Sequence, residues 1–429
     1  MRRVVITGLG IISPVGCDKE TFWQHLLTGV SGATLLKDVR CSPLFGHHDF
    51  GANVVCEVKD FKADQVPEPY KGMDRSIQFA LAAGHQAVQD AGLYPEQLCE
   101  AGVVLATAIC GTQTLDQEFV KVTAMGQTPI RSEEVDPHLY AAAMGNSAAL
   151  ALAERYHTQG ECVTLSTGCI AGVDAINYAF DSIAYGDHDL MLAGATEAPI
   201  TPITIAAFDI IHCLSHYQGD PTQASRPFCK SRDGFVLSEG CGVVVLEELE
   251  HALTRHATIY AELTGWAASE HAEHMTDMST DGQDLARTMV AALEASHIAA
   301  SDVDYINAHG TSTPQNDIRE TQAIQAALGS RAYEIPVNST KSMLGHALAA
   351  ASAMEVVACA MSLYEQKIHG TINYSDPDPA CDLDYVPQSR LCPIEYLLTN
   401  ASGFSGLHAV LAMKQYQVNR EGQAWLSHS

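Results

Sequence analysis

One cysteine and two histidines combine the residue types and the sequence positions that nucleophilic catalysis requires. Cys169 lies in a segment of small residues, 165–172, between an expected strand and an expected helix. His309 follows an expected strand, and His346 precedes a helix of small residues. Proteins that alternate strands and helices place their sites at such strand ends and helix starts. The three side chains therefore form a candidate nucleophile with two polarising groups.

The position of Cys169 favours a reactive thiolate. Residues 161–165 are expected to form a short, mostly buried strand, and apolar residues at helical spacing then predict a helix that ends at Gly186. A thiol at the start of this helix feels the positive end of the helix dipole, which favours the thiolate. The alternative is an inert structural cysteine, because free cysteines are among the most buried residue types. The two histidine motifs favour the nucleophile.

Composition indicates a large globular protein. The chain has 429 residues, of which 47% are hydrophobic, and a formal net charge of −27. This charge argues against non-specific binding to nucleic acid. The 13 cysteines are scattered without a Cys-x-x-Cys pair, so neither a disulfide framework nor a zinc ribbon is indicated. An odd cysteine count in a long chain fits a reducing cytoplasm, where we expect the protein to act.

Two apolar segments are weak candidates for membrane association. The basic residues at positions 2 and 3 precede apolar residues, but glycines and a proline interrupt that region and no cleavage site follows. Residues 347–364 form the most apolar long stretch, which Ser352, Glu355 and Ser362 interrupt. We therefore expect a buried helix there and no membrane span.

Two further motifs suggest ligands but do not complete their patterns. Gly8 and Gly10 follow an expected strand over residues 4–7, as in a dinucleotide-binding loop, yet Ser13 stands where the third glycine belongs. We expect a tight turn at the strand exit instead. A histidine pair at positions 271 and 274 has zinc-like spacing, but no third ligand with metal spacing follows. We expect no metal site at His271 and His274.

Strands alternate with helices twice along the chain, so the sequence predicts an α/β fold of two related halves. We expect an N-terminal half over residues 1–255, a C-terminal half over residues 256–415 and a polar extension over residues 416–429. The expected strands cover residues 103–106, 190–193, 240–246, 259–264, 304–307 and 337–339, and the expected helices cover residues 73–90, 140–156, 283–297 and 317–328.

An ordered set of motifs resembles the beta-ketoacyl-[acyl-carrier-protein] synthases of the thiolase superfamily, the synthase II group and its polyketide relatives. The motifs lie at residues 7–10, 168–169, 224–228, 232–235, 307–313, 341–346 and 403–406. The resemblance implies a thiolase-like fold, with the two halves forming a layered αβαβα core. It also implies no cofactor of the protein's own, since substrates of this family arrive on the phosphopantetheine arm of acyl carrier protein.

The resemblance implies a role for each residue of the constellation. Cys169 takes the acyl chain as a thioester, and His309 and His346 assist decarboxylation of a malonyl thioester. The resulting enolate attacks the Cys169 thioester in a Claisen condensation. The backbone N–H groups of Cys169 and Phe404 form the oxyanion hole, and the Phe404 ring is the gate of the site.

The remaining implied roles are supporting ones. Lys341 supports the histidines, and Glu355 is its ion partner. The positions that match substrate contacts are Thr311 and Thr313 for the phosphopantetheine arm, and Ile109 and Phe208 for an acyl pocket near the dimer interface.

Three departures from the fatty-acid enzymes bear on the pathway. Residues 166–169 and 198–203 are more similar to the ketosynthase alpha subunits of type II polyketide synthases. Ser405 and Gly406 stand where the fatty-acid enzymes have two glycines. Residues 66–75, where relatives present basic side chains to carrier protein, offer only two.

Three functions therefore compete. The first is a polyketide ketosynthase, working as a heterodimer with a homologous chain-length-factor subunit. The second is a fatty-acid synthase II, working as a homodimer. The third is a non-catalytic chain-length-factor-like subunit, which the presence of Cys169 with both histidines argues against. No nucleic acid or membrane partner is expected for any of them.

Overall fold

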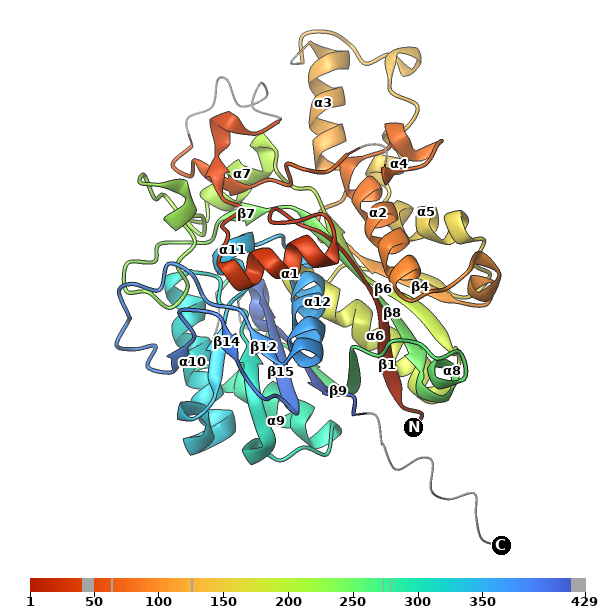
Figure 1. Ribbon diagram of the computed structural model, residues 1–429. Coiled ribbons are helices and arrows are strands. Elements are labelled where there is room, and N and C mark those ends of the chain that lie inside the picture. Colours follow the sequence, from red (N-terminus) through yellow and green to blue (C-terminus); the bar gives the residue numbers. More distant parts are fainter. Residues whose placement is uncertain (41–49, 63–64, 125, 273, 278, 418–429) are drawn as a thin grey trace, which may run out of the picture.

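The computed structural model describes residues 1–40, 50–62, 65–124, 126–272, 274–277 and 279–417 (Figure 1). Within these residues the main sheet has eleven strands in the order β13-β11-β10-β15-β16-β9-β1-β8-β6-β4-β5. The first half of the chain contributes β1 and every strand on its β5 side, and the second half contributes the rest.

The strands of the first half repeat in the second half. The first set is β1 (Val4–Ile12), β8 (Gly240–Glu248), β6 (Leu190–Glu197), β4 (Gly102–Ala106) and β5 (Cys162–Leu165). The second set is β9 (Ala261–Ser269), β16 (Leu407–Lys414), β15 (Tyr396–Gly403), β10 (Val303–Asn307) and β11 (Pro336–Asn338), with β13 (Asp384–Tyr385) at its edge. In each set the first three strands pair antiparallel and the last three pair parallel. The expectation of two related α/β halves is confirmed.

Helices form one central and two outer layers around the strands. The central pair is α6 (Ala171–Tyr185) and α12 (Ala349–Glu365), which pack on each other and on strands of both halves (Figure 1). The outer helices are α2 (Arg75–Asp90) and α5 (Ser147–Tyr156) on the first half, and α9 (Gln283–Ala295) and α10 (Pro314–Leu328) on the second. This is the layered αβαβα core that the thiolase-like resemblance implies.

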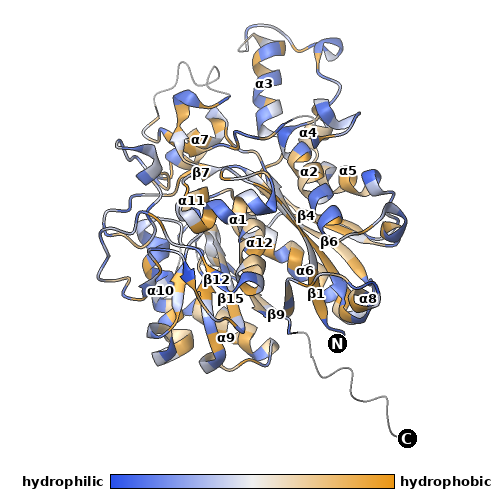
Figure 2. Ribbon diagram, in the orientation of Figure 1, coloured by the Kyte–Doolittle hydropathy of each residue, from blue (hydrophilic) through white to orange (hydrophobic). Residues whose placement is uncertain are grey.

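The central layer depends on small side chains. Residues 349–363 of α12 are all buried, and many of them are alanines. A helix rich in small residues can approach the strands of both halves and a neighbouring helix closely. The apolar stretch over residues 347–364 is therefore a buried helix, as expected. Figure 2 shows hydrophobic colour on these central elements and hydrophilic colour on much of the outer helices.

Shorter elements surround the core. The helices are α1 (Lys19–Thr28), α3 (Thr112–Thr123), α4 (Leu139–Ala143), α7 (Pro202–Asp209), α8 (Leu249–Thr254) and α11 (Lys341–Leu344). The strands are β2 (Thr34–Leu35), β3 (Val54–Cys56), β7 (Leu237–Ser238), β12 (Lys367–Ile368) and β14 (Arg390–Leu391).

Three local expectations are wrong. Strand β5 is not mostly buried: it lies at the sheet edge, where Cys162 is exposed and the other strand residues are half-buried. The single helix expected over residues 140–156 is two helices, because Gly145 and the polar Asn146 are weak helix formers between them. Gly8 and Gly10 do not form a turn, since β1 continues through them to Ile12.

The glycines of β1 serve packing. A Cβ built at Gly10 would lie 1.8 Å from the backbone oxygen of Ala83, and one at Gly8 would lie 2.2 Å from that of Ala87. Helix α2 therefore rests directly on the backbone of β1, which a side chain at either position would prevent.

The domain boundaries expected from the sequence stay predictions. The boundary at residue 255 falls between α8 and β9 but is not tested by the fold, and most of the extension expected over residues 416–429 lies outside the described residues. Among the helices of the described residues, none has the length and apolar character to cross a bilayer. The cytoplasmic location likewise stays a prediction.

We predict that Gly10→Ala destabilises the protein. The added methyl group would overlap the α2 backbone, and overpacking of this kind costs about 1–3 kcal/mol. Urea unfolding followed by circular dichroism measures the change. Gly145→Ala is the control, because its Cβ would meet only Cys110 Sγ at 3.7 Å. Equal stability of both variants would show that α2 does not rest on β1.

Candidate active site

Cys169 lies where β5 passes into the central helix. A single 3₁₀ turn, Gly168–Ile170, connects the strand to α6, and Gly168 adopts a φ of +65° that favours glycine. The carbonyl of Cys169 accepts a hydrogen bond from Ser352 Oγ at 3.2 Å, which links the Cys169 turn to α12. The thiol is therefore fixed at the junction of the two central helices.

His309 is held by a buried carboxylate that the sequence analysis missed. Its backbone N–H and that of Gly310 each donate to Glu320 of α10 at 2.8 Å. Glu320 is fully buried, and Asn400 Nδ2 also donates to it at 3.3 Å. The signal in the sequence is an acidic residue at helical spacing from Asp317 and Ile324, on a face of α10 that the structure buries.

His346 comes from the turn between α11 and α12. Its backbone N–H donates to the carbonyl of Val236 at 2.8 Å. Its ring lies edge-on to Phe235, with 5.2 Å between centroids, and edge-on to His309 at 5.3 Å. Nδ1 of His346 has no hydrogen-bond partner among the described residues. The two imidazoles thus meet edge to face, His309 from the segment after β10 and His346 from the turn between two helices.

A buried ion pair supports His309. Lys341 Nζ lies 2.5 Å from Glu355 Oε1 and 3.3 Å from His309 Nδ1, and all three side chains are almost fully buried. An ammonium group only donates hydrogen bonds, so His309 Nδ1 accepts and the ring proton lies on Nε2. His309 therefore presents an N–H donor on the opposite side of its ring from Lys341.

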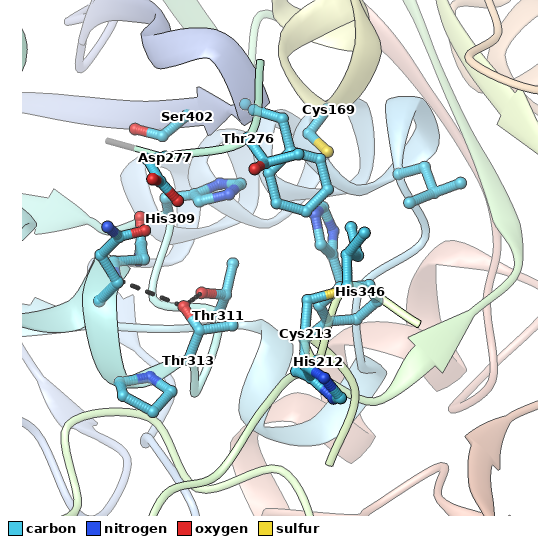
Figure 3. A pocket seen from close by; sticks show the side chains of 18 residues that line it. Cys169, His212, Cys213, Thr276, Asp277, His309, Thr311, Thr313, His346 and Ser402 are labelled. Atoms are coloured by element: carbon cyan, nitrogen blue, oxygen red, sulfur yellow. Dashed lines mark hydrogen bonds between the residues drawn. The ribbon is translucent and has the colours of Figure 1, made fainter. Parts of the chain in front are cut away.

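The two histidines and Cys169 share one pocket of about 300 Å³ (Figure 3). Its lining comes from both halves of the chain and includes Cys169, Cys213, Phe235, Asp277, His309, Thr311, Thr313, His346, Leu348 and Phe404. No lysine or arginine lines it in the part of the chain that the structure describes. The pocket therefore combines apolar walls with converging polar groups, as ligand sites do.

Burial sets the protonation states in this pocket. It lowers the pKa of His309 and of His346 well below 6.5, and Lys341 adds to both shifts, so both rings are neutral near pH 7. Burial also raises the pKa of the Cys169 thiol to about 12, although Lys341 opposes the shift. Burial therefore opposes the ionisation that the position of Cys169 at a helix start favours.

The residues matched to substrate contacts divide into two groups. Thr311 and Thr313 line the pocket, with their hydroxyl oxygens 2.8 Å apart. Ile109 and Phe208 do not line it; they lie with Cys169 in an apolar cluster. Phe404 lies between the groups, since it lines the pocket and its ring centroid is 6.4 Å from that of Phe208.

The histidine pair at 271 and 274 serves a loop. His274 Nδ1 accepts the backbone N–H of Asp277 at 3.1 Å, and His271 Nε2 lies 3.0 Å from the carbonyl oxygen of Asp277. Ser405 Oγ donates to the carbonyl of Met275 at 2.8 Å, which ties this loop to the segment that carries Phe404. Among the described residues, no three His, Cys, Asp or Glu side chains cluster as metal ligands do.

Two family models match this chain along most of its length. The model described as "Beta-ketoacyl synthase, N-terminal domain" matches residues 1–252, and the one described as "Beta-ketoacyl synthase, C-terminal domain" matches residues 260–375. The chain belongs to the beta-ketoacyl synthase family. It is a condensing enzyme of the acyltransferase class, as the sequence resemblance implied.

Relatives of this synthase come from two pathways. The tetracenomycin polyketide synthase ketoacyl synthase alpha subunit of Streptomyces glaucescens is 40% identical, over 96% of this chain and 97% of its own length. The 3-oxoacyl-[acyl-carrier-protein] synthase 2 of Synechocystis sp. is 42% identical, over 97% of this chain and 99% of its own.

Solved ketosynthases share the fold of this synthase closely. The AntDE:AntF structure, a type II PKS acyl-carrier protein in complex with its ketosynthase, matches with a TM-score of 0.89 and 41% identity over 97% of this chain and 100% of that one. The ishigamide ketosynthase/chain length factor matches with a TM-score of 0.86 and 33% identity over the same shares.

We predict that alkylation of Cys169 by iodoacetamide accelerates about tenfold per pH unit from pH 6 to pH 9, because only the thiolate reacts and its fraction rises this way below the pKa. Peptide mass spectrometry after timed quenching gives the rate at Cys169, and exposed Cys162 provides an internal comparison. A plateau near pH 7 would mean that the helix dipole and Lys341 outweigh burial.

Proposed function

We propose that this synthase loads an acyl chain onto Cys169 and extends it with a malonyl unit that His309 and His346 decarboxylate. The observation that carries the proposal is the shared pocket, in which a thiol and two neutral imidazoles converge and which no lysine or arginine of the described residues lines. Such a pocket suits a reaction in which charge develops on oxygen and carbon of the substrate and not on the protein.

Acyl transfer uses Cys169 and two backbone groups. The sulfur attacks the thioester carbonyl of the carrier-bound chain, an S–C bond forms, the bond to the arm sulfur breaks, and the thiol proton leaves with the arm. The N–H groups of Cys169 and Phe404 stabilise the oxyanion in this proposal. A Cβ built at Gly403 would lie 3.8 Å from the backbone nitrogen of Cys169, so the two segments are close enough for a shared oxyanion hole.

Decarboxylation uses the histidines. The neutral His309 ring, with its proton on Nε2, donates to the thioester oxygen of the malonyl unit, and His346 is the second donor. The carboxylate leaves as carbon dioxide, and the electron pair becomes an enolate whose oxygen these donors stabilise. The enolate carbon attacks the acyl-Cys169 carbonyl, a C–C bond forms, and the cysteine sulfur leaves as a thiolate that takes up a proton from solvent. Lys341, with Glu355, fixes the His309 tautomer that this step needs.

We assign the synthase to polyketide formation, with fatty-acid elongation as the alternative. Residues 198–203 and the context of Cys169 support this assignment, as does similarity to a chain named as a polyketide alpha subunit. The fatty-acid alternative rests on equal similarity to a 3-oxoacyl-[acyl-carrier-protein] synthase 2.

Carrier protein is the proposed donor of both substrates, on a phosphopantetheine arm that passes Thr311 and Thr313. The basic residues available to it are few. Lys71 pairs with Glu68 at 3.2 Å, and half-buried Arg75 pairs with Glu239 at 2.7 Å. Recognition of the carrier therefore depends little on residues 66–75.

A homologous second chain is the proposed partner, for which two features provide support. Strand β5 is an unpaired sheet edge next to the Cys169 turn, and unpaired edges favour association. Helices α3 to α5 and their connection expose large apolar side chains, namely Leu115, Phe119, Val120, Ile130, Tyr140, Met144 and Leu150. Exposed apolar surface of this extent marks an interface.

We predict that different single-residue variants abolish acyl loading and malonyl decarboxylation. Cys169→Ala abolishes the acyl mass added by acyl carrier protein, whereas His309→Ala and His346→Ala still load but lose decarboxylation by about 100-fold or more, because each removes a donor to the enolate oxygen. Intact-protein mass spectrometry reads loading, and carbon dioxide release from malonyl carrier protein reads decarboxylation.

The matched controls are Cys392→Ala and His188→Ala, which lie outside the pocket and should leave both readouts unchanged. Undiminished loading of Cys169→Ala excludes this nucleophile. Wild-type carbon dioxide release by both histidine variants excludes the proposed division of labour.

We predict that full chain elongation requires a homologous partner that lacks the nucleophile. Expression alone and together with a neighbouring homologue, followed by native mass spectrometry and an elongation assay, tests this. We expect a heterodimer and longer products only on co-expression, because a partner would bury the exposed apolar side chains of α3 to α5 in an interface. A homodimer that elongates fully by itself, unchanged by the homologue, would support the fatty-acid alternative.

A further inference from the structure

Another buried carboxylate lies close to Cys169 and has no part in the steps above. Glu197, the last residue of β6, is fully buried and forms no ion pair within 4.0 Å among the described residues. Its oxygens accept hydrogen bonds from Thr107 Oγ1 at 2.7 Å and from the backbone N–H groups of Ala108 at 2.8 Å and Ile109 at 3.2 Å. A fourth donor is the N–H of Ala349 at 3.4 Å.

These donors belong to two segments on different elements. Residues 107–109 follow β4, and Ala349 is the first residue of α12. Ile109 and Leu348, the residue before Ala349, lie with Cys169 and Phe208 in the apolar cluster that includes Ile200 and Ile205, here called the Cys169 cluster. The Glu197 carboxylate therefore connects the backbones of two segments, residues 107–109 and 348–349, that contribute side chains to the Cys169 cluster.

The Leu348 segment needs such support. Leu348 has a φ of +49° and a ψ of −121°, a conformation that residues with a Cβ rarely adopt and that persists only where surrounding contacts enforce it. The peptide that follows Leu348 donates to Glu197. Burial raises the pKa of Glu197 to about 7 against the effect of these four donors, so an acidic side chain here is maintained against a desolvation penalty.

We propose that Glu197 is a positioning residue that clamps residues 107–109 and 348–349 around Cys169, and thereby fixes the shape of the Cys169 cluster and the length of acyl chain that it accepts. The inference rests on the proposed function in one respect only, which is that this cluster receives the acyl chain. The role is separate from catalysis, because Glu197 contacts backbone and Thr107 and does not line the pocket.

The test compares a short and a long electrophile on the full chain, together with its partner where one is required. Iodoacetamide and N-octyl iodoacetamide both alkylate Cys169: the sulfur displaces iodide, an S–C bond forms, and the thiol proton passes to solvent. Only the octyl reagent needs space in the cluster. This assay requires no acyl transfer, so it remains valid if the proposed function fails. Loading from acetyl and octanoyl carrier protein is the parallel assay for the acyl chain itself.

We expect Glu197→Gln to lower the octyl-to-short rate ratio by about tenfold or more, since a glutamine cannot accept all four hydrogen bonds and its amide N–H₂ faces other donors. Glu197→Asp, which keeps the carboxylate, should restore part of the ratio. Thr107→Val removes one donor only and should lower the ratio by about threefold; it also provides the test if Glu197→Gln does not fold.

Glu247→Gln is the matched control, because Glu247 is an equally buried glutamate that Arg255, His251 and Thr7 hold away from the pocket. It should change stability and leave the ratio unchanged. The proposal is overturned if Glu197→Gln or Thr107→Val slows both reagents equally, or if Glu247→Gln shifts the ratio as much. The octyl-to-short alkylation ratio could change in a protein that never loads an acyl group. That result would support the positioning role of Glu197 and would exclude the Cys169 cluster as an acyl-chain site.

Discussion

The buried Lys341–Glu355 pair is the interaction on which the site depends. Two charges in the interior are costly unless they compensate each other, and here they meet at 2.5 Å with exposures of 2% and 1%. Burial raises the pKa of Glu355 to about 7 despite Lys341, so the pair gains little stability by itself. Its value lies in orientation, because the ammonium group fixes which nitrogen of His309 carries the proton.

The pair also connects the site to the fold. Glu355 belongs to α12, whose small residues let it pack against strands of both halves of the sheet, and Lys341 begins α11 shortly after β11. The same central layer holds the Cys169 turn through Ser352. Residues that are 172–186 positions apart in sequence therefore keep fixed relative positions without any metal ligand set among the described residues.

Sequence reasoning was sufficient for the fold class and for the three residues that converge. Motif order and strand–helix alternation locate Cys169, His309 and His346 at element ends, and in an α/β fold such ends meet. The unanticipated features are those that depend on tertiary burial. Glu320 and Glu197 look like ordinary acidic residues until the fold removes water from them, and the exposed edge of β5 depends on which strand becomes last in the sheet.

The pKa of Cys169 is another property that sequence reasoning could not predict, because it depends on tertiary burial. Its place at a helix start is visible in the sequence and favours a thiolate, but the apolar cluster that opposes ionisation is assembled from residues far apart in the chain. The competition between a local dipole and non-local burial is decided by the three-dimensional surroundings.

A buried cysteine that rests as a thiol has a consequence in an oxidising environment. Peroxides attack the thiolate, and oxidation beyond the sulfenic acid is largely irreversible. With a pKa of about 12, Cys169 exposes very little thiolate at neutral pH. The burial that opposes ionisation of Cys169 therefore also lowers the reactivity of its sulfur toward peroxides.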